Sequence, residues 1–311
     1  MSADPAEVVR PIDPLAPLQH GRYVDDLVTV VRDPVTPPAH GSRVAVTAHF
    51  ELWRDGSRLV VRHHVPDGRI DDSLTSLIDA ELFAPGWASG SDLFERIFTG
   101  IVLTARPDPL DAWILFYDHT FRRMREHRRR HRDRPAAGTG DAVEEFAVIH
   151  ATADGLVPPD ASVLEIGACF GFLALHLARL PRRRVEACDL TPGTMRLLGV
   201  LADRLGVPVR TFVADAARVP RPDRSADVVL LVHLLEHLDA AHGRRAIEEA
   251  LRVARHRVVI AVPYEQTPNA AFGHVRCIDR SDLDAWGAAA QGWSARTFDA
   301  LGGWLVLDRL L

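Results

Sequence analysis

The chain has 311 residues, of which 47% are hydrophobic and 25% charged, and its formal net charge is −5. This composition is ordinary for a soluble globular protein, and the acidic balance argues against nucleic acid or an anionic membrane as a general partner. Because the three scattered cysteines cannot form a disulfide framework, and neither a signal peptide nor a membrane-spanning run is recognisable, we expect a cytoplasmic protein.

The N-terminal part predicts a small α+β module over residues 1–134. Prolines dominate residues 1–40, in which 28–31 favours a strand. Alternation of apolar and polar residues over 43–53, followed by an Asp55-Gly56 turn and a second apolar run, predicts a β-hairpin. Helices are predicted at 71–83, 91–103 and 109–131, with Ser91 or Asp92 as the cap of the middle one. The segment 135–140 reads PAAGTG and predicts a linker.

Residues 141–311 predict strands that alternate with helices. The predicted strands are 162–166, 184–190, 209–215, 226–233 and 256–263, and the predicted helices are 141–154, 170–180, 192–205, 239–254 and 282–290. Such alternation implies parallel strands joined by right-handed crossovers. The last residues instead predict two strands around Gly302 and Gly303. The fold class is therefore α/β: a doubly wound, Rossmann-like, mostly parallel seven-stranded sheet that ends in an antiparallel hairpin.

The sequence VLEIGACFGF at 163–172 carries the clearest motif. An apolar strand leads into Glu165-x-Gly167-x-x-x-Gly171, a pattern typical of a turn whose backbone passes close to a cofactor and leads into a helix N-terminus with unpaired N–H groups. It departs from the G-x-G-x-x-G fingerprint, because Cys169 and Phe172 stand where that fingerprint needs glycine. A carboxylate at Glu165 repels phosphate and attracts a cation. S-adenosylmethionine, which has an ammonium group and no phosphate, fits these features better than a dinucleotide does.

Two further acids support a nucleoside ligand. Asp189 ends the second predicted strand, where an acid accepts hydrogen bonds from ribose hydroxyls. Asp215 ends the third, where an acid commonly meets an adenine amino group. With Glu165 these acids stand at the carboxyl ends of three predicted strands, so they are expected along one crevice.

With these motifs in place, residues 141–311 resemble the class I S-adenosylmethionine-dependent methyltransferases. The resemblance rests on VLEIGACFG, VEACDL, FVADA, DVVLLVHLLEHL, VVIAVP and TFDALGGWLVL. It implies the class I fold, S-adenosylmethionine as cofactor, and cofactor contacts from Glu165, Gly167, Ala168, Gly171, Asp189, Leu190, Asp215, Ala216 and His233. Cys169 stands where the family usually has glycine, and we expect a buried thiol there without a chemical role.

The segment HLLEHL after the fourth predicted strand supplies His233, Glu236 and His237, and His274 follows the fifth strand. A neutral histidine at this edge of the sheet can take a proton from a substrate hydroxyl, which makes His237, His233 and His274 candidate catalytic residues. Alternatively, Glu236, His237 and His274, together with His233, are ligand types that can hold one divalent metal ion. A third interpretation is that EHL only caps the following helix and contacts the cofactor. HxxEH followed by a later histidine resembles the metal site of RNA 2′-O-methyltransferases and of ubiquinone-pathway O-methyltransferases, with His233 where those have Glu.

Over its whole length the chain also resembles the mycofactocin oligosaccharide methyltransferases of actinobacteria. The resemblance rests on EIGACFGF, LLVHLLEHLDAAHGRR, NAAFGHVRCIDRSDL and the lysine-free N-terminal part. It implies O-methylation of a glucose hydroxyl in an oligosaccharide; another small molecule, such as a quinone or a natural product, is the alternative acceptor. The N-terminal module is then expected to cover the substrate or to form a homodimer.

Three alternatives stay open at this point. The arginine-rich segment 122–134 either binds an anionic partner or is a solvated helix end, and the second is favoured by the acidic net charge. An NAD-dependent oxidoreductase would bind a dinucleotide and lack the terminal hairpin. A non-catalytic module that binds the cofactor would not need the histidines of HLLEHL.

Overall fold

A computed structural model describes residues 9–34, 41–130, 141–180 and 182–310. The chain forms two compact units, Met1–Arg122 and Arg123–Leu311, and helix α3 (Pro109–Arg130) runs through the boundary between them. The predicted linker, 135–140, and the end of the arginine-rich segment, 131–134, lie outside the described residues. No helix within the described ranges is both long and apolar enough to cross a membrane.

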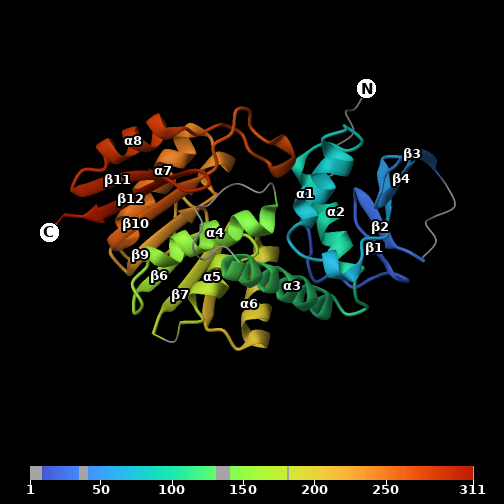
Figure 1. The fold of residues 1–311 in the computed structure, drawn as a ribbon, viewed down its shortest axis with the longest axis horizontal. Coiled ribbons are helices and arrows are strands. Elements are labelled where there is room, and N and C mark those ends of the chain that lie inside the picture. Colours follow the sequence, from blue (N-terminus) through green and yellow to red (C-terminus); the bar gives the residue numbers. More distant parts are fainter. Residues whose placement is uncertain (1–8, 35–40, 131–140, 181, 311) are drawn as a thin grey trace, which may run out of the picture. The chain divides into compact units, whose positions relative to one another are not determined.

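The N-terminal unit contains a five-stranded sheet with the order β1-β2-β5-β4-β3 (Figure 1). Its strands are β1 (Arg22–Val24), β2 (Val28–Arg32), β3 (Ser42–Val46), β4 (Phe50–Asp55) and β5 (Arg58–His63). β2 and β5 pair in parallel, and the other neighbours are antiparallel. The hairpin around Asp55 and Gly56 is as predicted.

The single strand predicted at 43–53 is wrong. The chain turns after Val46, and β3 and β4 pair with each other as two antiparallel strands. Alternating apolar residues do not show where a strand is interrupted, and Val46, predicted to share the apolar face, is exposed.

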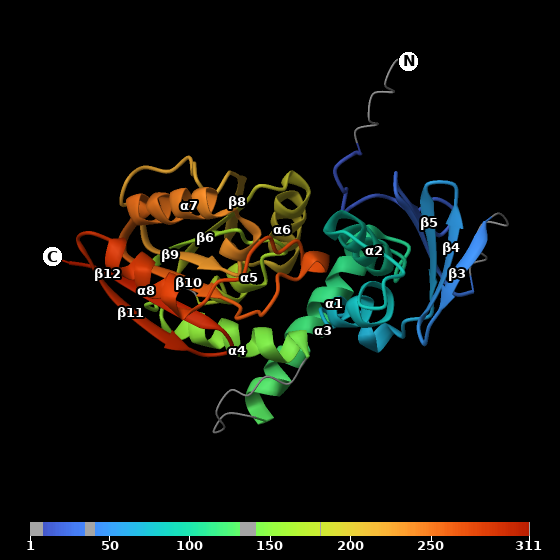
Figure 2. The ribbon, with the colours of Figure 1, turned by 90° about the horizontal axis from the view of Figure 1, so that it is seen from above.

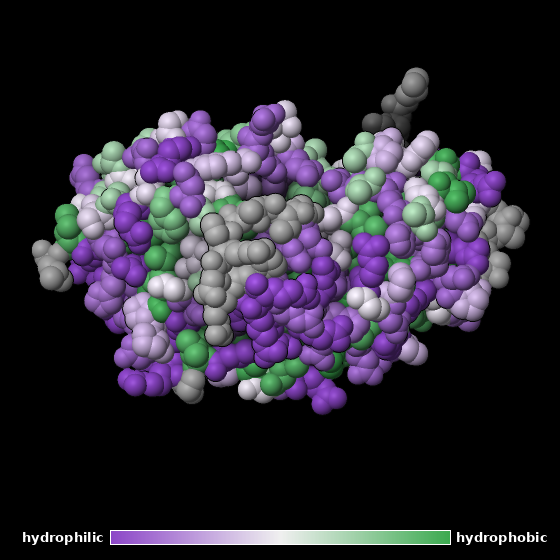
Figure 3. Space-filling model, in the orientation of Figure 1, coloured by the Kyte–Doolittle hydropathy of each residue, from purple (hydrophilic) through white to green (hydrophobic). Residues whose placement is uncertain are grey.

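The helices of this unit are η1 (Asp67–Arg69), α1 (Leu74–Ile78), η2 (Asp79–Phe83), α2 (Ser91–Leu103) and the first part of α3. The predicted cap of α2 is wrong, because Gly90 is the N-cap residue and Asp92 instead accepts a hydrogen bond from Arg96. Figure 3 shows a strongly hydrophilic surface over α3. Its last two turns expose several arginines, while Arg123 is bonded to Asp141 and Arg130 to Glu126.

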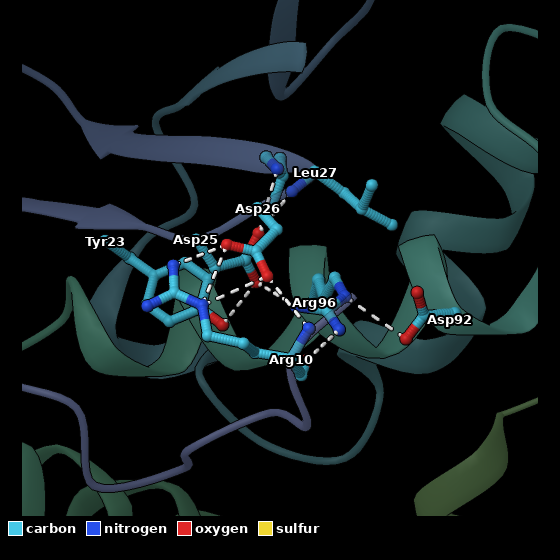
Figure 4. A network of polar contacts seen from close by, with 8 residues as sticks. Arg10, Tyr23, Asp25, Asp26, Leu27, Asp92 and Arg96 are labelled. Atoms are coloured by element: carbon cyan, nitrogen blue, oxygen red, sulfur yellow. Dashed lines mark hydrogen bonds and ion pairs between the residues drawn. The ribbon is translucent and has the colours of Figure 1, made fainter. Parts of the chain in front are cut away.

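A buried arginine ties α2 to the strands of the same unit (Figure 4). The side chain of Arg96 is 3% exposed and donates to Asp25, to Asp92 and to the backbone carbonyl of Arg10. Asp25 also accepts from the Tyr23 hydroxyl, while Arg10 pairs with Asp26. Every nitrogen of this guanidinium therefore has an acceptor.

The C-terminal unit confirms the predicted α/β fold. Its seven-stranded sheet has the order β11-β12-β10-β9-β6-β7-β8. The strands are β6 (Ser162–Ile166), β7 (Arg184–Asp189), β8 (Val209–Val213), β9 (Ala226–Val232), β10 (Ala254–Val262), β11 (Trp293–Asp299) and β12 (Gly303–Arg309). All neighbours are parallel except β12, which pairs antiparallel with both β10 and β11. This order, with the last strand inserted antiparallel beside β10, is that of the class I methyltransferase fold.

Helices cover both faces of this sheet, and Figure 2 shows α4 and α7 on opposite sides of it. The helices are α4 (Ala142–Gly155), α5 (Phe172–Leu177), α6 (Pro192–Leu205), η3 (Leu235–His237), α7 (Ala240–Val253), η4 (Ala270–Phe272) and α8 (Arg280–Ala289). Aliphatic side chains of the central strands, such as Leu164, Val229 and Ile260, pack with those of α7 and α8 into one core. This core holds the carboxyl ends of β6, β7, β9 and β10 at one edge.

Candidate functional site

The turn after β6 is built by residues with positive φ. Gly167 has φ +77°, Cys169 +47° and Gly171 +70°. A Cβ at Gly167 would lie 2.7 Å from Leu234 Cδ1, and one at Gly171 would lie 2.4 Å from Leu198 Cδ2. The backbone conformation favours glycine at both positions, and a side chain at either would also have to displace a leucine.

Helix α5 begins only after Gly171, two residues later than predicted, because the turn occupies 167–171. The N–H groups of the turn itself, before the helix begins, are paired within the protein. The N–H groups of Gly167 and Ala168 both donate to the carbonyl of Cys188, at 2.8 and 3.0 Å, and that of Gly171 donates to Ala168. A pyrophosphate would find these donors already engaged.

Asp189 braces this turn from the end of β7. One carboxylate oxygen accepts the N–H of Cys169 at 2.9 Å, and the other accepts the N–H of Thr191 at 2.9 Å. A carboxylate has about four acceptor positions, so Asp189 keeps capacity for a ligand. Cys169 is exposed, not buried as expected, and it lies in the turn with a positive φ.

Glu165 lies beneath the turn with 5% of its surface exposed. Its Oε2 atom is buried and has no hydrogen-bond partner in the described protein. Burial raises the pKa of Glu165 to about 8, although a hydrogen bond from the Ala174 backbone works in the opposite direction. A buried acid in this state is stabilised by any cation that reaches it.

Asp215 follows β8 and accepts hydrogen bonds from the Ala217 backbone at 2.8 Å and from His242 Nε2 at 2.6 Å. The hydrogen bond from Ala217 and then that from His242 hold the pKa of Asp215 below its usual value. Leu190 is exposed and Ala216 half-buried. His242, on α7, was not predicted, because its contact with Asp215 joins residues 27 apart in sequence.

His233 directly follows β9 and has φ +54°, and its ring lies 5.8 Å from that of Phe146 on α4. Burial, and next the nearby His274, lower the pKa of His233 to about 4, so the imidazole is neutral at pH 7. Its Nδ1 is 3.5 Å from Glu236 Oε1. The contact with Phe146 was not predicted from the sequence, since α4 precedes the whole sheet.

Glu236, His237 and His274 come together after β9 and β10. They can each offer one ligand atom such that all three atoms lie within 4.8 Å of one another. The rings of His237 and His274 are 4.7 Å apart and almost perpendicular. The backbone N–H of Val275 donates to the carbonyl of Glu236 at 2.9 Å, which fixes the two segments against each other.

Glu236 is the most deeply buried member of this group. Its side chain is 1% exposed, and both carboxylate oxygens lack a hydrogen-bond partner in the described protein. Burial raises the pKa of Glu236 to about 8, and the negative charge of Glu265 adds to the effect. A buried polar group without a partner is costly in free energy. Binding of a ligand or of a proton would therefore stabilise this carboxylate.

The His237 side chain is exposed, but its ring packs almost perpendicular to that of His274 and is partly removed from water. This desolvation, with the charge of His274, lowers the pKa of His237, while a hydrogen bond with the Gly273 backbone raises it. The net direction is downward, so the ring is neutral at pH 7. A neutral imidazole with one nitrogen bonded to a carbonyl keeps its other nitrogen as a proton acceptor.

Residues 163–257 match the protein family described as "Methyltransferase domain". Ajmaline N-methyltransferase of Rauvolfia serpentina is 28% identical over 103 residues, which are 32% of this chain and 35% of that protein. The chain thus spans about a third of the length of this curated relative.

Two solved structures are similar over about half of this chain. The YcgJ protein of Bacillus subtilis is 22% identical and has a TM-score of 0.42, covering 50% of this chain and 70% of its own. A SAM-dependent methyltransferase of Aquifex aeolicus is 17% identical with a TM-score of 0.42, covering 51% of this chain and 86% of its own. The fold assignment does not depend on them, since it follows from the strand order. Residues 163–257 match a methyltransferase domain and lie within a sheet that has the class I strand order.

Proposed function

We propose that this protein is an S-adenosylmethionine-dependent O-methyltransferase that acts on a hydroxyl group of a small molecule. The observation that carries the proposal is the group Glu236, His237 and His274, which lies at the same sheet edge as the glycine turn. Ligands of doubly wound sheets bind at this carboxyl edge. The cofactor and the reacting hydroxyl can therefore meet there.

The residues around the turn fit S-adenosylmethionine. Glu165 offers a buried, unpartnered oxygen toward which an ammonium group is attracted, and Asp189 keeps acceptor positions for ribose hydroxyls. Asp215 stands further along the edge for the adenine. Gly167, Ala168, Gly171, Leu190, Ala216 and His233 complete the proposed pocket. When bound, the cofactor supplies a methyl group on a positively charged sulfur.

His237 is the proposed general base. Its ring is neutral at pH 7, and the hydrogen bond with the Gly273 backbone fixes which nitrogen is free. When the acceptor oxygen bonds to the methyl carbon and the bond from that carbon to sulfur breaks, His237 would take up the hydroxyl proton. The ring of His274 packs against that of His237, and the neutral ring of His233 adds no positive charge nearby.

Glu236, His237 and His274 also fit one divalent cation, which we propose as the second form of the same site. The two orphaned oxygens of Glu236 and the converging imidazoles are suitable donors. His233 stands outside this group of three. A bound ion would lower the pKa of the acceptor hydroxyl, so that His237 would act as a ligand and not as a base.

For the acceptor we propose a sugar hydroxyl of an oligosaccharide of the mycofactocin type. The proposal is supported by the resemblance of segments on both sides of the site, EIGACFGF and NAAFGHVRCIDRSDL. A quinone or a natural product remains the alternative hydroxyl acceptor. The name of the curated relative favours a second candidate, an amine nitrogen.

The test is to incubate the protein with methyl-labelled S-adenosylmethionine and a cell extract, with and without EDTA, and to identify the labelled product by mass. An O-methylated sugar supports the full proposal, and an N-methylated product supports the second candidate. Loss of labelling in EDTA, restored by a divalent metal, supports the cation form. Tight calorimetric binding of NAD without binding of S-adenosylhomocysteine would overturn the methyltransferase proposal.

A further inference from the structure

A carboxylate that the sequence did not single out stands behind His274. Glu265 follows β10, and its Oε2 lies 2.8 Å from His274 Nδ1. The side chains of Glu265 and His274 are 22% and 9% exposed, so water competes weakly for this contact. The pair is enclosed within one loop, because only nine positions separate the two residues.

The backbone of this loop is already fixed without Glu265. The N–H of His274 donates to the carbonyl of Asn269, and the N–H of Val275 donates to the carbonyl of Glu236. Asn269 in addition caps the short helix η4. What remains to be determined is the rotation of the His274 ring and the nitrogen that carries its proton.

A carboxylate at Nδ1 fixes both the rotation of the His274 ring and the nitrogen that carries its proton. It accepts the Nδ1–H, which leaves Nε2 as the nitrogen with a lone pair. Since Nδ1 is engaged by Glu265, Nε2 is the atom left to face Glu236 and His237. The ring of His237 is hydrogen-bonded to a weaker partner, the neutral backbone carbonyl of Gly273. A carboxylate makes the opposite nitrogen a stronger electron-pair donor than a carbonyl does.

We propose that Glu265 is a positioning residue of the site: it holds His274 as the Nδ1–H tautomer with Nε2 directed at Glu236 and His237. The proposal deepens the proposed function and rests on it for its purpose. It does not rest on it for its test, because the tautomer exists in the protein without cofactor or acceptor.

The test is two-bond ¹H–¹⁵N correlation spectroscopy of the full chain labelled with ¹⁵N-histidine, with His274 assigned through His274→Gln. We expect the Nδ1–H tautomer in the native chain and in Glu265→Gln, whose amide oxygen still accepts. Glu265→Leu should shift His274 toward the Nε2–H tautomer. The matched control is Glu81→Leu, which removes another carboxylate from a histidine, His49, at 2.6 Å in the N-terminal unit. The control should leave the His274 signals unchanged.

Kinetics on the labelled acceptor fraction provide the second measurement. Glu265→Leu should lower kcat about 10–100-fold with KM for S-adenosylmethionine within about twofold, and Glu265→Gln should recover part of the rate. An Nε2–H tautomer in the native chain, or an unchanged tautomer in Glu265→Leu, would overturn the inference even if methyl transfer is observed. Absence of any transfer alongside the expected spectra would instead count against the proposed function.

Discussion

The two units bury charged side chains in opposite ways. Arg96 in the N-terminal unit is 3% exposed and is bonded to Asp25, Asp92 and a backbone carbonyl. Glu236 in the C-terminal unit is 1% exposed, and neither of its carboxylate oxygens has a hydrogen-bond partner in the described protein. The charged group of Arg96 is therefore fully hydrogen-bonded within its own unit, whereas the carboxyl group of Glu236 is not.

This difference separates a structural from a functional buried charge. Removing a charge from water costs several kcal/mol, which partners inside the protein can offset. For Arg96 those partners are present, so its role ends with holding α2 to the strands. For Glu236 and Glu165 the cost is met by taking up a proton, which is why burial raises the pKa of each to about 8. Such acids are poised to exchange that proton for a cation.

The largest expected effect concerns His237, the neighbour of the unpartnered Glu236. As a general base, His237→Ala should slow turnover about 10²–10⁴-fold, and activity should be insensitive to chelators. The measurement is the initial rate of label transfer with and without EDTA. Calorimetry with S-adenosylhomocysteine serves as the control, since the cofactor pocket should be intact.

In the cation form the outcome differs in a way that the same assay detects. EDTA would abolish activity, and Glu236→Ala would be as damaging as His237→Ala, because loss of either ligand opens the site. A fully active Glu236→Ala that resists EDTA would exclude this form.

The next effect is on stability and concerns Arg96, whose guanidinium is fully hydrogen-bonded. Arg96→Met should lower the free energy of unfolding of the N-terminal unit by about 3 kcal/mol, near the low end for a broken buried ion pair. The low end is expected because Asp25 keeps its hydrogen bonds from Tyr23 and from the backbone of Leu27 and Val28. Urea denaturation followed by tryptophan fluorescence measures it. Equal stability of the variant and the native chain would show that the network contributes no net energy.

The sequence predicted the C-terminal unit in most of its details. The strand at 162–166 and the helix at 192–205 have the predicted bounds, because long apolar stretches and Pro192 mark them clearly. The ends of elements were less predictable where a tight turn sets the backbone conformation. Helix α5 is shorter than its apolar pattern suggests, since the glycine turn uses its first residues.

At the site, sequence reasoning found residues that follow strands and missed those that act through a partner. Glu236, His237 and His274 were predictable, since each stands just after a parallel strand or in the loop beyond it. The partners Glu265 and His242 were not, because neither belongs to a motif and their contacts arise only from the folded loops. A carboxylate nine residues before a candidate histidine is a weak signal that sequence alone cannot distinguish from a solvated loop acid.

A smaller effect is expected at Asp189, whose carboxylate is shared between the turn and the proposed ribose. Asp189→Ala should weaken binding of S-adenosylhomocysteine by about 1–3 kcal/mol, because ribose hydroxyls lose an acceptor and Cys169 N–H loses its partner. Asp203→Ala, on the surface of α6, is a suitable control for a lost acid. Isothermal calorimetry gives both affinities, and equal values would contradict the proposed role.

A further effect is the pH dependence of stability at Glu165. Its pKa in the folded chain is raised to about 8 from an ordinary value of 4.5. The folded state therefore binds a proton that the unfolded state releases, so the stabilising contribution is complete below pH 4.5 and is lost as pH rises toward 8. Glu165→Gln keeps the shape without the titration. Between pH 5 and pH 8 its melting temperature should fall less than that of the native chain, by about 2–4 °C for each kcal/mol removed. If the melting temperatures of the two proteins changed with pH in parallel, Glu165 would be charged in the folded state. It would then already have a cationic or water partner and would be a structural buried charge like Arg96.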